Sequence, residues 1–225
     1  MKISIITLFP EIFLPVFNSS ILGRAQKKGK VAFEMINLRD FGQGRHKTVD
    51  DKPYGGGVGM VLKVDVLAKA LNSAARVQSP ESRVILMSAS GKTFNQTKAK
   101  SLSKRKQLII VCGHYEGVDQ RFIDKYIDEE ISIGDYILTG GEIPAMAVID
   151  SLTRLLPGVL EKPEATKKES FENGLLEHPQ YTRPETFKGM KVPKVLLSGN
   201  HAKIANWQDE KSRQKTNKVR PDLLG

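Results

Sequence analysis

The sequence predicts an α/β fold built on a mostly parallel β-sheet. Short apolar runs follow one another with little polar alternation, a pattern typical of strands that are buried on both faces. Segments with helical spacing separate these runs, as expected where helices cover a parallel sheet. The 225 residues, of which 40% are hydrophobic, suffice for one large domain, or for one domain with a small appendage.

Six apolar runs predict the strands of the sheet. Most are rich in Ile, Val and Leu and are bounded by glycine or polar turn residues. Because several lack any polar alternation, we expect helices on both faces of the sheet. The predicted strands span residues 3–8, 31–38, 84–87, 108–112, 130–133 and 136–138.

Two segments between these strands predict helices. Val64, Leu67, Ala68 and Leu71 recur at helical spacing and would share one apolar face. Residues 93–96 read Thr-Phe-Asn-Gln, which matches a capping box. We therefore expect a helix that begins there and continues through Leu102.

The pattern changes near residue 160. Residues 161–170 contain no apolar residue larger than alanine or proline and carry six charges, which is typical of a linker. The chain beyond is rich in Pro and Lys and predicts one helix, from about Asn200 to Lys215. The predicted organisation is a first domain over 1–160, a linker over 161–172 and a small helical domain over 173–225.

Composition favours a polyanionic partner. The net charge is +10 and the pI is near 9.6, and Lys and Arg side chains that meet phosphates release bound counterions. No apolar run approaches the roughly 20 residues that span a bilayer, and the first residues show no signal-peptide cleavage pattern, so we expect a cytoplasmic protein. The single cysteine, Cys112, lies in an apolar run and is expected to be buried.

Three predicted strands end in turns that contain glycine. These turns cover residues 88–91, 113–117 and 133–141. Ligands of α/β sheets bind at the carboxyl ends of strands, where glycine lets the backbone approach closely. The three turns would then surround one small molecule. The alternative is that the glycines only end the strands, and the residues alone leave both interpretations open.

Several common motifs are incomplete. Residues 91–93 resemble the end of a phosphate-binding P-loop, but Leu86 stands where that motif requires glycine. The glycines of residues 55–59 follow a polar segment rather than a strand, which favours a mobile loop over a dinucleotide site. The four histidines lack the Cys or Glu pairing of a zinc site, and no nucleophile-elbow serine occurs. Zinc enzymes and serine hydrolases are therefore disfavoured.

Four longer motifs occur in a distinctive order. Residues 45–60 read RHKTVDDKPYGGGVGM, 112–117 read CGHYEG, 132–145 read SIGDYILTGGEIPA and 175–184 read LLEHPQYTRP. In these motifs, and from residue 3 to residue 201, the chain resembles bacterial tRNA (guanine-N1)-methyltransferases. The resemblance implies a SPOUT fold with a deep trefoil knot, a homodimer, and tRNA with guanosine at position 37 as substrate.

The same resemblance implies that S-adenosylmethionine is the methyl donor, held bent by the three glycine turns. A magnesium ion near Glu116 is a further implication. Ala89 departs from the proline that the family commonly has, and this change is expected to loosen the first turn. The implied cofactor-binding residues are Met87, Ser88, Ala89, Gly91, Gly113, Tyr115, Glu116, Gly117, Ser132, Ile133, Gly134, Asp135, Tyr136, Ile137, Leu138, Gly140, Gly141 and Pro144.

Two residues are implied in catalysis. Guanine N1 carries a proton and becomes nucleophilic only as that proton leaves, so the reaction needs a base, and a cation for the charge that develops on O6. Family members place an Asp before Ser-Phe as the base, whereas this chain has Glu169 there. Arg154 matches the arginine that stabilises O6, although a phosphate contact or a structural ion pair would also explain it.

Substrate contacts follow from the resemblance as well. The chain ends at Gly225, where many relatives continue, so the C-terminal domain is expected to be shortened. Two alternatives stay open: a knotted methyltransferase that acts on another RNA atom, such as a ribose 2′-hydroxyl, and an RNA-binding relative that lost catalysis. The implied tRNA-binding residues are His46, Asp50, Gly59, Arg183, Ser198, Asn200 and His201.

Overall fold

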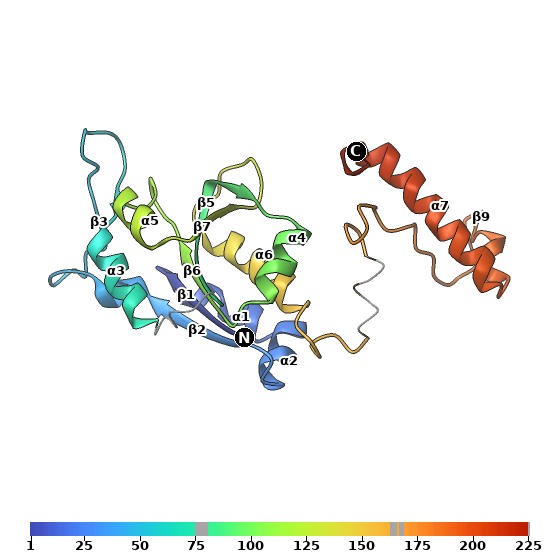
Figure 1. Cartoon of the computed structure of the whole chain (residues 1–225), viewed down its shortest axis with the longest axis horizontal. Helices are drawn as coiled ribbons and strands as arrows, with labels where there is room; N and C mark the ends of the chain where they lie inside the picture. Colours follow the sequence, from blue (N-terminus) through green and yellow to red (C-terminus); the bar gives the residue numbers. More distant parts are fainter. Residues whose placement is uncertain (75–80, 163–165, 167–168, 225) are drawn as a thin grey trace. The chain divides into compact units, whose positions relative to one another are not determined.

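The structure is a computed structural model that describes residues 1–74, 81–162, 166 and 169–224. The chain divides into two compact units, Met1–Glu161 and Lys162–Gly225 (Figure 1). Part of the predicted linker, residues 163–165 and 167–168, lies outside the described residues. The assignment of one ligand-binding domain, a linker and one tRNA-binding domain stays a prediction.

A five-stranded, entirely parallel sheet forms the centre of the first unit, with strand order β2-β1-β6-β5-β7 (Figure 1). Every residue of β6 is buried, because this strand pairs with β1 on one side and β5 on the other and is covered on both faces. The predicted α/β class and parallel sheet are confirmed. The strands are β1 (Lys2–Thr7), β2 (Ala32–Asn37), β5 (Ser82–Thr93), β6 (Gln107–Cys112) and β7 (Glu129–Ser132).

Helices cover both faces of this sheet (Figure 1). Successive strand residues alternate between two apolar clusters, because neighbouring side chains of a strand point to opposite faces. The helices that complete the first cluster are α1 (Leu14–Phe17), α2 (Ser20–Lys27), α4 (Gln96–Ser103) and α6 (Glu142–Thr153). Those that complete the second are α3 (Val64–Ser73), α5 (Gln120–Tyr126) and η2 (Leu38–Phe41). The short η1 (Pro10–Ile12) precedes α1.

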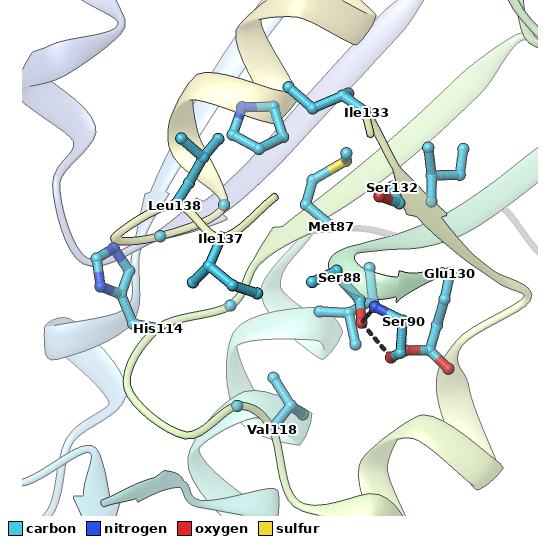
Figure 2. A pocket seen from close by; sticks show the side chains of 18 of the residues that line it. Met87, Ser88, Ser90, His114, Val118, Glu130, Ser132, Ile133, Ile137 and Leu138 are labelled. Atoms are coloured by element: carbon cyan, nitrogen blue, oxygen red, sulfur yellow. Dashed lines mark hydrogen bonds between the residues drawn. The ribbon is translucent and has the colours of Figure 1, made fainter. Parts of the chain in front are cut away.

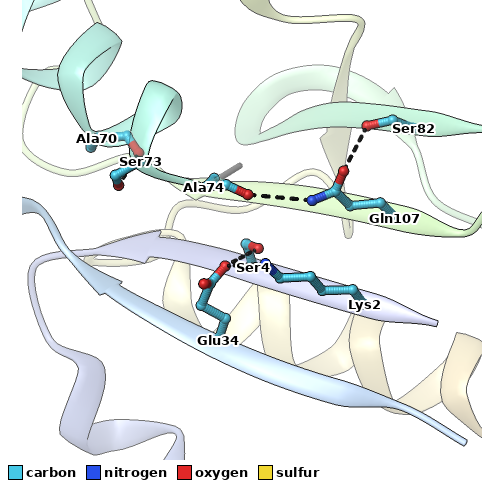
Figure 3. Close-up of polar contacts among 8 residues, drawn as sticks. All are labelled: Lys2, Ser4, Glu34, Ala70, Ser73, Ala74, Ser82 and Gln107. Atoms are coloured by element: carbon cyan, nitrogen blue, oxygen red, sulfur yellow. Dashed lines mark hydrogen bonds and ion pairs between the residues drawn. The ribbon is translucent and has the colours of Figure 1, made fainter. Parts of the chain in front are cut away.

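Buried polar side chains in the sheet find partners nearby (Figure 3). Ser4 of β1 is fully buried, and its hydroxyl donates to the Glu34 carboxylate of β2 at 2.5 Å. Gln107 at the start of β6 donates to the Ala74 carbonyl at 3.4 Å and accepts from the Ser82 hydroxyl at 3.5 Å. These bonds offset the cost of removing polar groups from water.

The predicted strand over 136–138 is wrong. Gly134 adopts φ +151°, and the Tyr136 amide donates to the Gly134 carbonyl, so the chain turns away after β7. The Ile137 side chain is 84% exposed instead of packed in a sheet. A strand needs a neighbour to satisfy its backbone groups, and this segment instead runs as a loop towards α6.

The structure also corrects the start of α4. Thr93 was predicted to cap this helix, but it is the last residue of β5 and pairs with Ser132 of β7. Asn95 is the N-cap, and its side chain accepts a hydrogen bond from the Lys98 amide at 2.9 Å. The predicted turn over 88–91 is likewise part of β5, at a register shift against β7 between Met87 and Lys92.

A small antiparallel pair lies beside the main sheet. Strand β3 (Asp50–Asp51) pairs with β4 (Val61–Leu62), and the glycine-rich residues 55–59 form the loop between them. Leu62 also bridges Val118 in the loop after β6. This contact brings the glycine-rich loop next to one of the predicted glycine turns.

The second unit contains one long helix, α7 (His201–Val219). The predicted helix is confirmed, and it begins one residue after Asn200, whose side chain caps it by accepting from the Lys203 amide at 3.1 Å. Thr216 of this helix is fully buried, and its hydroxyl accepts from the Leu176 amide at 2.8 Å. The unit also contains the strand pair β8 (Thr186–Phe187) and β9 (Met190–Lys191) with η4 (Lys194–Leu197) and η5 (Pro221–Leu223).

A helix must be both long and apolar to cross a lipid bilayer. None of the described helices combines the two.

The strand order and register do not test how the chain threads through itself, so the trefoil knot stays a prediction.

Candidate active site

A cavity of about 500 Å³ lies at the carboxyl ends of β5, β6 and β7 (Figure 2). This volume falls in the range of small-molecule sites. Figure 2 shows Met87 of β5 and Ile137 and Leu138 of the loop after β7 around the same space. The three segments predicted as glycine turns therefore line one pocket, the first of them without its glycine.

Most of the implied cofactor-binding residues line this cavity. Gly91 and Asp135 do not. Gly91 instead packs against β7, where an added Cβ would come within 2.5 Å of the Ile131 amide nitrogen. Those that line the cavity are Met87, Ser88, Ala89, Gly113, Tyr115, Glu116, Gly117, Ser132, Ile133, Gly134, Tyr136, Ile137, Leu138, Gly140, Gly141 and Pro144.

The cavity also includes residues that the sequence did not single out. Ser90, His114 and Thr139 lie inside the predicted turns, so taking every residue of each turn as a candidate would have included them. The Ser90 hydroxyl lies 2.8 Å from that of Ser88 (Figure 2). Val118 and Ile123 carry no local signal, because only packing brings them to the pocket. The additional lining residues are Leu86, Ser90, His114, Val118, Gln120, Ile123, Glu130, Ile131 and Thr139.

Two glycines bring the loop after β7 against the loop after β6. The Gly141 amide donates to the Gly113 carbonyl at 2.8 Å, and Gly140 forms an antiparallel bridge with His114. A Cβ on Gly141 would come within 2.7 Å of the Cys112 Cα. Glycine is therefore needed at 141 for close backbone approach, and the two loops form one wall of the cavity.

Cys112, at the end of β6 beneath this wall, is 2% exposed, so the expectation of a buried thiol is confirmed. Burial raises the pKa of the Cys112 thiol well above its ordinary value of 9.0, and the Glu142 carboxylate raises it further. The thiol is thus held protonated in the folded chain, where it acts as a small apolar side chain.

This raised pKa predicts a pH-dependent stability. Below pH 9.0 the thiol is protonated in both states, whereas above it only the unfolded chain loses the proton, so the free energy of unfolding falls as pH rises. The expected contribution is about 1.4 kcal/mol per pH unit. Urea unfolding from pH 8 to pH 10 should show this extra slope in the natural chain and lack it in Cys112→Ala. Parallel profiles for the two chains would contradict the prediction.

The glycine-rich loop reaches the pocket through Gly59. This residue has φ +97°, and a Cβ there would come within 2.3 Å of Glu116 Oε1. The Glu116 amide donates to the Met60 carbonyl at 3.0 Å, which ties the two segments together. Asp50 lies half-buried in β3 and His46 is exposed in the preceding turn. The first-unit residues implied in tRNA binding thus lie in and on either side of β3, and Gly59 contacts the cavity-lining residue Glu116.

The two implied catalytic residues belong to different units. Arg154 is the C-cap of α6 and is half-buried. Glu169 is half-buried in the second unit, in a turn where its carbonyl accepts from the Glu172 amide at 3.2 Å. Their roles stay predictions.

The remaining residues implied in tRNA binding lie in the second unit. His201 is exposed at the start of α7, and Arg183 is exposed beside Pro184. Ser198 and Asn200 have structural partners: the Ser198 hydroxyl donates to the Val195 carbonyl at 2.7 Å, and Asn200 caps α7. These two side chains therefore shape the helix start in addition to any contact with RNA.

The described residues contain no cluster of ligands for the implied magnesium ion. Within residues 1–74, 81–162, 166 and 169–224, no three His, Cys, Asp or Glu side chains gather in a way that would hold a metal ion. Glu116 lines the cavity beside Gly59. The cavity lining carries the carboxylates of Glu116 and Glu130, but among the described residues they belong to no group of three ligands that could hold a metal ion.

Comparison with known proteins identifies the family. The family model described as tRNA (Guanine-1)-methyltransferase TrmD matches residues 1–225. The tRNA (guanine-N(1)-)-methyltransferase of Anoxybacillus flavithermus is 52% identical over 100% of this chain and 91% of the relative. Those of Dictyoglomus turgidum and Bacillus subtilis are 53% and 51% identical, over 100% of this chain and 90% and 92% of the relatives. The chain belongs to the tRNA (guanine-N1)-methyltransferase family.

Proposed function

We propose that this protein transfers a methyl group from S-adenosylmethionine to N1 of guanosine 37 in tRNA, the nucleotide after the anticodon. The single observation that carries the proposal is the cavity formed by three glycine-containing segments at the carboxyl ends of neighbouring parallel strands, in a chain of this family. We further propose that the protein acts in the cytoplasm, where such a tRNA would be its substrate.

The residues around the cavity fit S-adenosylmethionine. Met87, Leu138 and Pro144 offer apolar surface for a flat adenine ring, and the loops offer backbone N–H and C=O groups for the polar parts of the molecule. Gly117 has φ +122°, a conformation that side-chain-bearing residues rarely adopt. The backbone can therefore approach the ligand closely, as a cofactor held largely by main-chain groups requires.

When bound, S-adenosylmethionine supplies an electrophilic methyl group on its sulfonium. The protein must then make guanine N1 nucleophilic and hold it in line with that methyl group. In the proposal Glu169 accepts the N1 proton, and the Arg154 guanidinium stabilises the negative charge that develops on O6. A carboxylate suits the first task and a permanently charged guanidinium the second.

The surroundings of the cavity suit a guanine base that has left its stack. Tyr115 at the cavity is half-exposed, and the glycine-rich loop beside it can close around an extruded base.

The proposal also includes a homodimer. In a homodimer Glu169 could come from the partner subunit, which agrees with its place in a separate compact unit. The net charge of +10 favours the phosphate backbone of tRNA.

Transfer of labelled methyl from S-adenosylmethionine to two tRNA transcripts tests the proposal. One transcript carries guanosine at positions 36 and 37, and the other carries adenosine at 37. We expect label in the first transcript only, on N1 of guanosine 37. Label on a ribose would instead favour a methyltransferase with another target atom, and cofactor binding without transfer would favour an inactive RNA-binding relative.

A further inference from the structure

A buried chain of side chains joins β1 to α6 and to the loop after β6. The Thr7 hydroxyl donates to Glu142 Oε1 at 2.6 Å, and His114 Nε2 lies 2.7 Å from Glu142 Oε2. Thr7 is fully buried and Glu142 is 5% exposed. A buried carboxylate is costly unless both oxygens have donors, and this one has a donor on each.

The direction of these bonds follows from the chemistry of the groups. A carboxylate only accepts, so Thr7 and His114 Nε2 both donate to Glu142. The Phe9 amide donates to the Thr7 oxygen at 3.0 Å, which leaves the hydroxyl hydrogen directed at Glu142. Glu142 is also the first residue of α6, where the helix dipole favours a negative charge. The Glu142 carboxylate is therefore stabilised by the Thr7 hydroxyl, by the His114 ring and by the dipole of α6.

This chain of bonds lies directly against the glycines of the cofactor pocket. A Cβ on Gly140 would come within 2.2 Å of His114 Nε2 and 2.6 Å of Glu142 Oε2. Gly140 also bridges His114 through the backbone, and both residues line the cavity. The His114 ring packs edge-on against Phe9, with 5.1 Å between ring centroids. Any movement of Glu142 would thus displace the pocket wall.

We infer that Thr7, Glu142 and His114 are positioning residues for the methyl donor. They hold the loop of residues 133–141 against the loop of residues 113–117, and so keep the pocket in the shape that binds S-adenosylmethionine. The inference rests on the proposed function, since it assumes that this cavity takes the donor. None of the three transfers a proton or a methyl group; they act through Gly140 and Gly141.

Thr7→Val tests this role, because valine keeps the shape of threonine and removes only the hydroxyl. We expect the donor Kd, measured by calorimetry, and the donor KM to rise about 10- to 100-fold, the loss of a hydrogen bond to a buried charge. The kcat at saturating donor should change less than threefold. Thr7→Ser should restore the natural affinity, because it restores the hydroxyl.

Ser4→Ala is the matched control. Ser4 is also a fully buried hydroxyl of β1 that donates to a carboxylate, that of Glu34 (Figure 3). Neither Ser4 nor Glu34 lines the cavity, whereas the bonds from Thr7 reach the lining residue His114 through Glu142. Both substitutions should lower the thermal midpoint. Only Thr7→Val should weaken donor binding.

Equal donor affinity of Thr7→Val and Ser4→Ala would overturn the inference and leave the network a purely structural one. If Thr7→Val does not fold, His114→Asn carries the test, because this side chain is at the cavity rim and partly exposed; it should show the same rise in donor Kd. Failure of the natural protein to bind S-adenosylmethionine would instead refute the proposed function, so the two failures are distinguishable.

Discussion

Glu169→Gln is expected to lower the single-turnover rate of tRNA methylation by about 100- to 10,000-fold, the usual contribution of a general base. Glutamine has the shape of glutamate but cannot accept the N1 proton. Donor affinity should stay unchanged, because Glu169 does not line the cavity. Rapid-quench transfer of labelled methyl, with enzyme in excess over a guanosine-37 transcript, measures this rate directly.

The control for this substitution is Glu172→Gln, which removes a half-buried carboxylate three residues further along the same turn. It should leave the rate within threefold of the natural protein. Glu169→Asp installs the residue that the family places before Ser-Phe, and it should retain methylation. Near-natural methylation by Glu169→Gln would exclude Glu169 as the base.

Gly141→Ala is expected to abolish donor binding at micromolar concentrations and to destabilise the fold. Gly141 has φ −81° and ψ −4°, which alanine adopts readily, so the effect comes from the clash alone. The new Cβ would come within 2.7 Å of the Cys112 Cα and 2.8 Å of the Gly113 nitrogen. Both are main-chain atoms at the end of a buried strand, so they cannot rotate away, and overpacking of this kind costs about 1–3 kcal/mol.

Calorimetric titration with S-adenosylmethionine and thermal unfolding measure both effects of Gly141→Ala. Gly29→Ala is the control: Gly29 has φ +63° but no atom within 4 Å of the added Cβ. It should destabilise the protein by about 1–2 kcal/mol through backbone strain and leave donor affinity unchanged. Natural donor affinity in Gly141→Ala would show that the two loops yield more easily than their packing indicates.

The pocket was only partly predictable from strand-end glycines. Two of the glycine segments follow β6 and β7, and the third lies near the carboxyl end of β5. Parallel strands direct their carboxyl ends to one edge, so the meeting of these segments follows from the sequence pattern. Gly91 shows the limit of that reasoning. It also follows an apolar run, but β5 continues past it to Thr93 and pairs with β7, so Gly91 faces a neighbouring strand instead of the cavity.

The α/β class, the parallel sheet, the helix α7 and the family could all be predicted from the amino-acid sequence, because they depend on local periodicity and on long ordered motifs. Three features could be seen only in the folded chain: residues 136–138 form a loop, Asn95 caps α4, and Thr7 and His114 both contact Glu142. Thr7 and Glu142 are 135 positions apart. Their contact leaves no local pattern, since it exists only once α6 packs against the sheet and the cost of burying the carboxylate requires partners.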